Sequence, residues 1–182
     1  VTGVQTCALP ISLSFILQLL LIPYLTRHLG LINFGLVAFG QVVCLYMGVL
    51  CDYGFSYTGV RQVSINREST NKLSYIFSAI LNSKILLGFF LLSVSSVFFF
   101  NVPRFNAHFV FFVLCYPIVI GQILIPLWFF QGTEQMKYIT FFNSGSKILS
   151  AIVIFLTVRN EEDYIYVNFI QGLFSFAVGV IS

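Results

Sequence analysis

Long apolar runs dominate the chain, and short polar segments separate them. A helix that crosses the hydrocarbon core of a bilayer needs about 20 predominantly apolar residues. Runs approaching that length recur along the sequence, and we predict a membrane helix in each of them. Only helices or closed barrels satisfy backbone groups in lipid, and runs this long exclude barrel strands, so the pattern predicts an all-α membrane protein. The predicted helices cover residues 12–25, 34–50, 73–100, 109–129, 138–158 and 164–182.

The composition supports this prediction. Hydrophobic residues make up 58% of the chain, and only 8% of its residues are charged. A soluble domain carries about 25% charged residues, so a water-soluble fold could not hide this much apolar surface. The net charge of +3 is small and is spread among the polar segments, which argues against a nucleic-acid partner. The bilayer itself is therefore the expected surroundings of this chain.

The longest break in the apolar pattern runs from Asp52 to Lys84. It holds six of the fifteen charged residues of the chain. A basic segment between two membrane helices is typical of a cytoplasmic loop, and we predict one here. Its cations are also candidates for contact with an anionic substrate or lipid. The six charged residues are Asp52, Arg61, Arg67, Glu68, Lys72 and Lys84.

The distribution of Lys and Arg predicts an orientation. We expect a short loop at residues 27–35, after which the connections alternate between the two sides of the membrane. Cytoplasmic segments are enriched in Lys and Arg, so the richer side and the native N-terminus are predicted to be cytoplasmic. That side holds Arg61, Arg67, Lys72, Lys84, Lys137 and Lys147, and the other side holds Arg27, Arg104 and Arg159.

Polar residues recur inside several apolar windows at spacings of three and four, which places each set on one helix face. One interpretation is a hydrophilic cavity that these faces line together. The other is that small polar residues pack the helices against one another. The sets are Thr140, Asn143, Ser144, Lys147 and Ser150; Gln41, Cys44, Gly48 and Asp52; Asn168, Gln171, Ser175 and Gly179; and Ser74, Ser78 and Asn82.

Lys84 and Lys147 lie well inside apolar windows. A charge at the centre of a membrane helix costs about 2.5–3.5 kcal/mol even on lenient scales. We therefore predict that each lysine faces water, a counter-ion or a substrate, with snorkelling to the membrane surface as the competing explanation. Pro117 interrupts the fourth window and predicts a kink there, because proline removes a helical hydrogen bond.

The sequence contains no motif of a known enzyme. Glycine-rich nucleotide loops, the zinc-protease helix and the nucleophile elbow are all absent. The four cysteines form no CxxC pair and have no histidine at metal-ligand spacing, so we expect them to be buried apolar residues. We predict a protein that is not an enzyme, with no catalytic residue, no metal and no cofactor.

Residues 1–11, VTGVQTCALPI, resemble the translation of a common sequencing adapter over their whole length. We expect this segment not to be native and leave it out of the fold prediction. The chain has no initiator Met and stops within an apolar run. We therefore expect residues 12–182 to be the N-terminal transmembrane lobe of a longer protein, truncated at both ends.

Three stretches resemble a known family. They are IPYLTRHLGLINFGLVAFGQ at residues 22–41, DYGFSYTGVRQVSINR at residues 52–67, and PLWFFQGTEQMKYIT at residues 126–140. Together they are similar to the bacterial O-antigen and polysaccharide repeat-unit flippases of the Wzx or RfbX type. Those proteins belong to the multidrug/oligosaccharidyl-lipid/polysaccharide (MOP) exporter superfamily. With the spacing of these blocks, the resemblance spans nearly all of the chain after Ile11.

The resemblance implies a MATE-like fold of two six-helix lobes around a central cavity, of which this chain would supply the first. The implied activity is alternating-access transport of undecaprenyl-diphosphate-linked oligosaccharide across the bacterial inner membrane. The implied partners are that lipid-linked oligosaccharide, the lipid bilayer and, as a candidate, the polysaccharide polymerase machinery.

Such a cargo needs a wet and cationic path, which gives five candidate residues for the cavity. Arg61, Lys84 and Lys147 could attract the diphosphate, and Asn143 could bond to sugar hydroxyls. Asp52 could pair with Arg61 or sense a coupling ion. All five are hypotheses based on residue type and depth in the membrane.

Three alternatives stay open at this point. A MATE-type multidrug exporter would carry cationic cargo, which favours carboxylates inside the membrane over the basic bias seen here. A membrane glycan polymerase or ligase would be expected to carry a large external loop, and the predicted external loops are short. A structural subunit would not need several polar helix faces.

Overall fold

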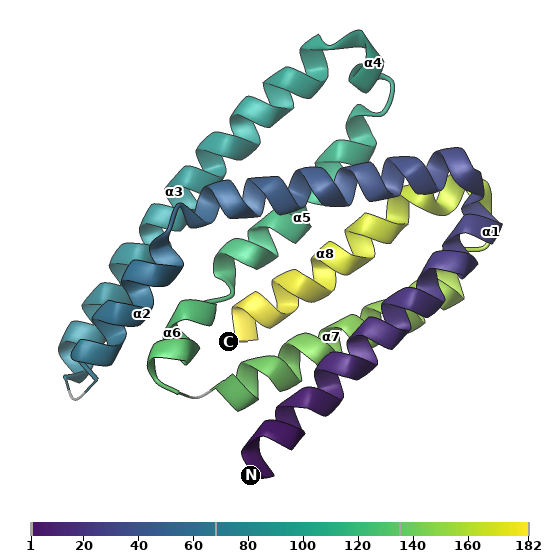
Figure 1. Ribbon diagram of the computed structural model, residues 1–182. Coiled ribbons are helices and arrows are strands. Elements are labelled where there is room, and N and C mark those ends of the chain that lie inside the picture. The colour runs from purple at the N-terminus through teal and green to yellow at the C-terminus, as the bar shows by residue number, and fades with distance from the viewer. Residues whose placement is uncertain (1, 68, 135, 182) are drawn as a thin grey trace.

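The computed structural model describes residues 2–67, 69–134 and 136–181, with the side chains of residues 2–15, 70, 137 and 138 left out. Within these ranges the chain forms helices and no strand, which confirms the all-α class (Figure 1). The elements are α1 (Thr2–Asp52), α2 (Phe55–Ile65), α3 (Thr70–Asn101), α4 (Pro103–Asn106), α5 (Phe109–Leu124), α6 (Leu127–Gly132), α7 (Met136–Thr157), the 3-10 helix η1 (Glu161–Asp163) and α8 (Tyr164–Ile181).

Five helical segments of the described chain are long and apolar enough to cross a membrane, by length and composition. Large apolar side chains cover much of the outside; Leu86 and Phe89 of α3, for example, are about three-quarters exposed. Such an exterior fits hydrocarbon and not water. A multi-pass membrane protein is thereby confirmed. The segments are Ile16–Asp52, Asn71–Asn101, Phe109–Gly132, Ile139–Thr157 and Glu161–Ile181.

The connection predicted at residues 27–35 is present but is shorter than predicted, because only Gly30 leaves the helical region there. Gly30 has φ 73° and ψ 166°, a conformation that is essentially restricted to glycine. The first two predicted membrane helices are therefore both present, as the two arms of α1 that meet at this kink (Figure 1). The five candidate segments correspond to the six predicted helices, because the first segment, Ile16–Asp52, includes both arms on either side of the kink.

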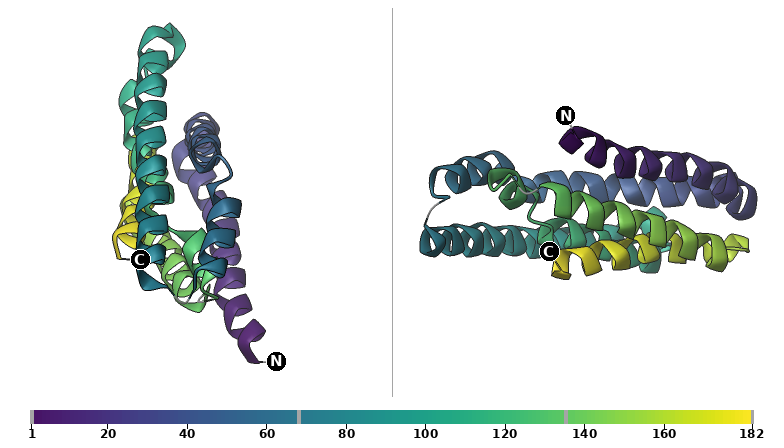
Figure 2. Two further views of the ribbon diagram at one scale, coloured as in Figure 1. Left: turned by 90° about the vertical axis from the view of Figure 1, so that its left-hand side faces the viewer. Right: turned by 90° about the horizontal axis from the view of Figure 1, so that it is seen from below.

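The bend of α1 is tied to the end of α7. The Tyr24 hydroxyl donates to the carbonyl oxygens of Phe155 at 3.1 Å and Val158 at 2.8 Å. Beyond the bend, the Asn33 amide donates to the carbonyl oxygen of Glu161 at 3.1 Å. In the view from below, the first arm of α1 forms one edge of the bundle, and α3 and α8 lie toward the opposite edge (Figure 2).

The predicted polar loop after Asp52 is largely helical. The chain turns through Tyr53 and Gly54, which both have positive φ, and continues as α2. One face of α2 packs closely on α6 through glycines. A Cβ on Gly59 would come within 2.7 Å of the Trp128 ring, so only glycine lets the helix approach this closely.

The fourth predicted membrane helix is interrupted at Pro126. Helix α5 continues through Pro117 and ends at Leu124, and α6 starts after Pro126. The interruption that the sequence placed at Pro117 therefore lies nine residues later, since Pro126 has no amide hydrogen to continue the helix. Pro117 itself packs against Gly172 of α8.

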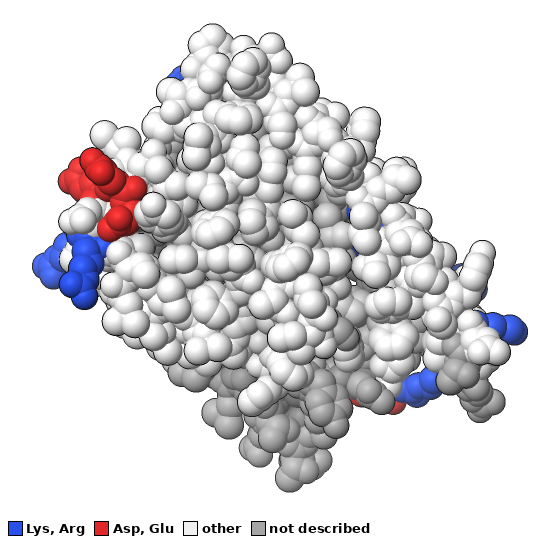
Figure 3. All heavy atoms as spheres, turned by 180° about the vertical axis from the view of Figure 1, so that it is seen from behind, with Lys and Arg blue, Asp and Glu red and all other residues white. Residues whose placement is uncertain are grey.

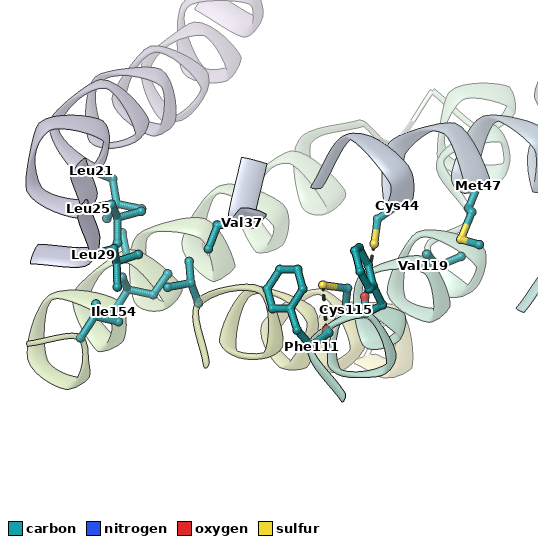
Figure 4. Close-up of a cluster of buried hydrophobic side chains, with 14 of the residues drawn as sticks. Leu21, Leu25, Leu29, Val37, Cys44, Met47, Phe111, Cys115, Val119 and Ile154 are labelled. Atoms are coloured by element: carbon teal, nitrogen blue, oxygen red, sulfur yellow. Dashed lines mark hydrogen bonds between the residues drawn. The ribbon is translucent and has the colours of Figure 1, made fainter. Parts of the chain in front are cut away.

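The main core joins both arms of α1 to α5, α7 and α8 (Figure 4). Leu25 and Leu29 of the first arm meet Ile154 of α7, while Val37 of the second arm lies near Phe111 of α5. This core fixes the relative positions of the helices whose polar faces form the site described next.

Candidate functional site

A polar cavity lies between the two arms of α1 and helices α5, α7 and α8. It consists of two adjoining volumes of about 190 Å³ and about 500 Å³. The two volumes share Gln18, Gln122 and Gln171 in their linings. Three uncharged amide side chains from three different helices therefore meet at the junction.

Helix α7 contributes one polar wall. Asn143, Ser146, Lys147 and Ser150 all line the smaller volume, at spacings that place them on one face of the helix. Lys147 is the single charged residue in the lining of either volume, among the residues that the structure describes. The polar stripe predicted on this helix thus lies along a cavity, at least through Asn143, Lys147 and Ser150.

Glutamines continue the polar surface on the other walls. The Gln41 amide, on the second arm of α1, donates to Oε1 of Gln171 on α8 at 3.0 Å. Gly48 leaves room for Gln122, because a Cβ there would come within 1.9 Å of the glutamine oxygen. Sequence reasoning did not select Gln18 or Gln122. An uncharged amide inside an otherwise apolar window is the signal that could have found both.

Asp52 and Lys84 meet each other and not the cavity. Nζ of Lys84 lies 2.5 Å from Oδ1 of Asp52, where α1 ends against the middle of α3. The Lys84 side chain is 6% exposed, so it is buried against the partly exposed Asp52 and does not snorkel to the surface. Within the described part of the chain Asp52 pairs with Lys84, and the alternative pairing with Arg61 is not formed.

Two further predictions, that Arg61 and the polar face of α3 line a common cavity, differ from the structure. Arg61 is exposed on α2 and lines neither cavity volume. The polar residues of α3, Ser74, Ser78 and Asn82, are also exposed, so α3 does not share the common interior. The structure thus brings Asn143 and Lys147 together and leaves Asp52, Lys84 and Arg61 elsewhere.

Other polar groups pack helices together. Asn168 of α8 is fully buried, and its amide donates to the carbonyl oxygen of Val37 at 3.2 Å and to Sγ of Cys115 at 3.3 Å. The Cys44 thiol donates to the carbonyl oxygen of Cys115 at 3.5 Å (Figure 4). Burial of cysteine is confirmed for Cys44, Cys51 and Cys115, and the side chain of Cys7 lies outside the described part.

This arrangement suits a ligand that is rich in hydroxyls and carries negative charge. Amide groups both donate and accept hydrogen bonds, as sugar hydroxyls do. The ammonium group of Lys147, an exposed residue of α7, adds a positive charge that attracts an anion. The lining of the two volumes offers no carboxylate among the described residues, so it lacks the groups that would favour a cationic ligand.

The chain is similar to a polysaccharide biosynthesis family and to two proteins named as O-antigen transporters. A family described as "Polysaccharide biosynthesis protein" matches residues 2–182. A "Putative O-antigen transporter" of Escherichia coli (strain K12) is 33% identical over 169 residues, which cover 93% of this chain and 41% of the relative. A protein of the same name from Shigella dysenteriae is 26% identical over 175 residues, covering 93% of this chain and 42% of the relative. The chain thus spans about two fifths of their length. No solved structure matches.

Proposed function

Because the chain belongs to the polysaccharide biosynthesis protein family, we propose that it forms part of a flippase for O-antigen or polysaccharide repeat units. The proposed cargo is an oligosaccharide linked to undecaprenyl diphosphate, carried across the bacterial inner membrane by alternating access. The relatives named in the comparison are transporters, which supports a carrier and not an enzyme.

The polar cavity is the observation that carries this proposal. Apolar side chains cover the outside of the bundle, and Gln, Asn, Ser and Lys side chains take part in lining the cavity. A glycan cannot cross the apolar core unless its hydroxyls find hydrogen-bond partners along the way. The diphosphate likewise requires a positive group, and Lys147 supplies one on the α7 wall.

The volumes are small for a whole repeat unit. We propose that the remaining length of the protein, as in the longer relatives, forms a second lobe that completes the cavity. In that arrangement the wall that includes Gln18, Gln122 and Lys147 would face the cargo from one side. The activity belongs to the full-length protein under this proposal.

A multidrug exporter of the same fold is the second candidate. Its cationic cargo would be repelled by Lys147 and would find no carboxylate in the described lining. The charge of the cavity therefore favours the anionic glycolipid.

Substitution of Lys147 in the full-length gene tests the proposal. We expect Lys147→Ala to lower the rate of surface glycan delivery about tenfold or more, since a hydrogen bond to a charged group contributes about 1.5–3 kcal/mol. Lys147→Arg keeps the charge and should retain most of the delivery. The measurement is surface polysaccharide in a strain that lacks the chromosomal gene, with the transporter level checked by immunoblotting.

Arg104→Ala is the matched control. Arg104 is an exposed cation on α4 that lines neither volume, so its loss should leave delivery unchanged. Normal delivery by a stable Asn143→Ala, Lys147→Ala double variant would refute the assignment of this cavity to the cargo.

A further inference from the structure

A basic and aromatic surface lies at the corner between α2 and α3, apart from the polar cavity. Figure 3, seen from behind, shows Lys and Arg atoms along this edge of the molecule. The cations of this surface are exposed, and so are its tyrosines, which are 76–86% accessible. We call this surface the basic corner, and it consists of Arg61, Arg67, Lys72, Tyr53, Tyr57 and Tyr75.

Two grooves lead into the basic corner. Their volumes are about 410 Å³ and about 390 Å³, and both are lined by Asn66 and Lys72. The first groove adds the amides of Gln62 and Asn71, and the second adds Arg67. Nitrogen donors predominate among these polar side chains, which suits the oxygens of a phosphate group.

The corner rests on a rigid support. On its inner face, α2 holds Gly59 against Trp128 and Val63 against Gly132 of α6. The opposite face of α2 presents Tyr57 and Arg61, four residues apart and both exposed. The packing of α2 against α6 thus determines which side chains of α2 are exposed.

The charge of the segment is positive. Residues 53–75 contain three cations and one acidic residue, Glu68. The guanidinium nitrogen Nη1 of Arg67 also lies 3.4 Å from Oε1 of Glu134 in the α6–α7 turn. The Arg67 side chain is 43% exposed and the Glu134 side chain is 80% exposed. A pair this exposed contributes little to stability, so Arg67 can exchange its carboxylate partner for a phosphate at little cost.

The position of the corner matches a membrane boundary. The candidate span on α3 begins at Asn71, which together with Lys72 lines the first groove, so the α2–α3 turn lies where this span leaves the apolar layer. Tyrosine is enriched at that depth because its ring is apolar and its hydroxyl is polar. Tyr75, which lines the first groove and is 76% exposed, therefore places the grooves at the level of lipid headgroups.

We propose that the basic corner binds the headgroup phosphate of anionic phospholipids, of the phosphatidylglycerol type, in the surrounding bilayer. Lys72 and Arg67 contact the phosphate, the groove amides donate hydrogen bonds to it, and Arg61 adds to the local positive potential. The exposed tyrosines pack beside the upper part of the acyl chains. This lipid site is separate from the cavity proposed for the cargo.

The test uses the purified full-length protein in detergent, with lipid binding followed by native mass spectrometry. Phosphatidylglycerol, phosphatidylcholine and undecaprenyl phosphate are titrated separately. Each surface cation contributes about fivefold to the affinity for an anionic lipid. The Arg61→Gln, Arg67→Gln, Lys72→Gln variant should therefore lose most of its phosphatidylglycerol binding and keep its weak phosphatidylcholine binding. Lys72→Gln alone should lose about fivefold.

The matched control removes the same charge from the other end of the bundle. Arg27→Gln, Arg104→Gln, Arg159→Gln should bind phosphatidylglycerol as the unmodified protein does, because these exposed arginines lie outside the corner. Equal loss in the control would overturn the proposal, and so would unchanged binding in Lys72→Gln and the triple variant. A loss confined to undecaprenyl phosphate would overturn it too, by assigning the surface to the cargo lipid.

Discussion

Asp52 and Lys84 form an ion pair whose two members differ in their access to water. The Lys84 side chain is 6% exposed, and the Asp52 side chain is 33% exposed. A buried charge that loses its partner is strongly destabilising, whereas a charge that can reach water is less so. The energetic consequence of breaking this pair therefore depends on which residue is removed.

We predict that Asp52→Ala destabilises the protein more than Lys84→Met does. Asp52→Ala leaves a buried ammonium without its counter-ion, at a cost of about 3–5 kcal/mol. Lys84→Met keeps an apolar chain of similar length in place, and Asp52 can turn toward water. Thermal unfolding of the purified full-length variants measures the difference.

The exchange Asp52→Lys, Lys84→Asp supplies the control for this pair. It should recover part of the stability lost in Asp52→Ala, because the attraction is restored with the charges reversed. Equal melting temperatures for Asp52→Ala and Lys84→Met would contradict the assigned difference in burial.

Helices α5 and α8 approach each other through glycines. A Cβ on Gly121 would come within 2.7 Å of the backbone of Ser175, and a Cβ on Gly172 would come within 2.8 Å of the Ile118 amide nitrogen. Small residues let membrane helices pack backbone to backbone, where no hydrophobic force drives them together. This contact supports the polar cavity, because Gln122 and Gln171 lie one residue away from these glycines.

We predict that Gly121→Ala lowers the free energy of unfolding by about 1–3 kcal/mol, the usual cost of overpacking a close contact. Neither backbone can move aside without separating the two helices. Thermal unfolding of the full-length protein in detergent gives the measurement.

Gly145→Ala on α7 is the matched control for this substitution. No heavy atom lies within 4 Å of its would-be Cβ, so the change should gain up to about 1 kcal/mol from helix propensity. Similar melting temperatures for the two alanine variants would show that α5 and α8 are not in the close contact described.

Apart from Asp52, Lys84 and Lys147, the charged residues that the structure describes gather toward two ends of the molecule. Acidic residues of η1 gather beside basic atoms at one edge of the face in Figure 3, and further Lys and Arg atoms lie at the opposite edge. Arg67 and Glu134 join the α2–α3 and α6–α7 turns at the second end. Each end of the bundle therefore suits one aqueous side of a membrane.

We predict that the end with the α2–α3 turn is cytoplasmic, since it lies on the side richer in Lys and Arg. In whole cells, Glu162→Cys should react with a membrane-impermeant thiol reagent and Ser64→Cys should not. Both positions are exposed, and Cys44, Cys51 and Cys115 are buried, so their background labelling should be low. The experiment uses a background that lacks Cys7. Labelling of Ser64→Cys before cell lysis would reverse the orientation.

Sequence alone determined the class of this protein and most of its helices. The apolar runs are long enough to span a membrane and only 8% of the residues are charged, which indicates that lipid surrounds the chain. Runs of this length satisfy their backbone hydrogen bonds in lipid as helices. The spacing of Asn143, Lys147 and Ser150 indicated one polar helix face, because helical periodicity is a local property. That face does line a cavity.

Tertiary structure decided which polar residues meet. In the sequence Lys84 and Lys147 both lie well inside apolar windows, so the same environment was predicted for both. In the structure Lys84 pairs with Asp52, whereas Lys147 lines the cavity. The sequence likewise predicted a connection at residues 27–35, and the structure showed that this connection is a kink at one residue, Gly30, with a φ of 73°. Periodicity fixes the face on which a side chain lies, but the partner of that face depends on how distant helices pack, which no local pattern encodes.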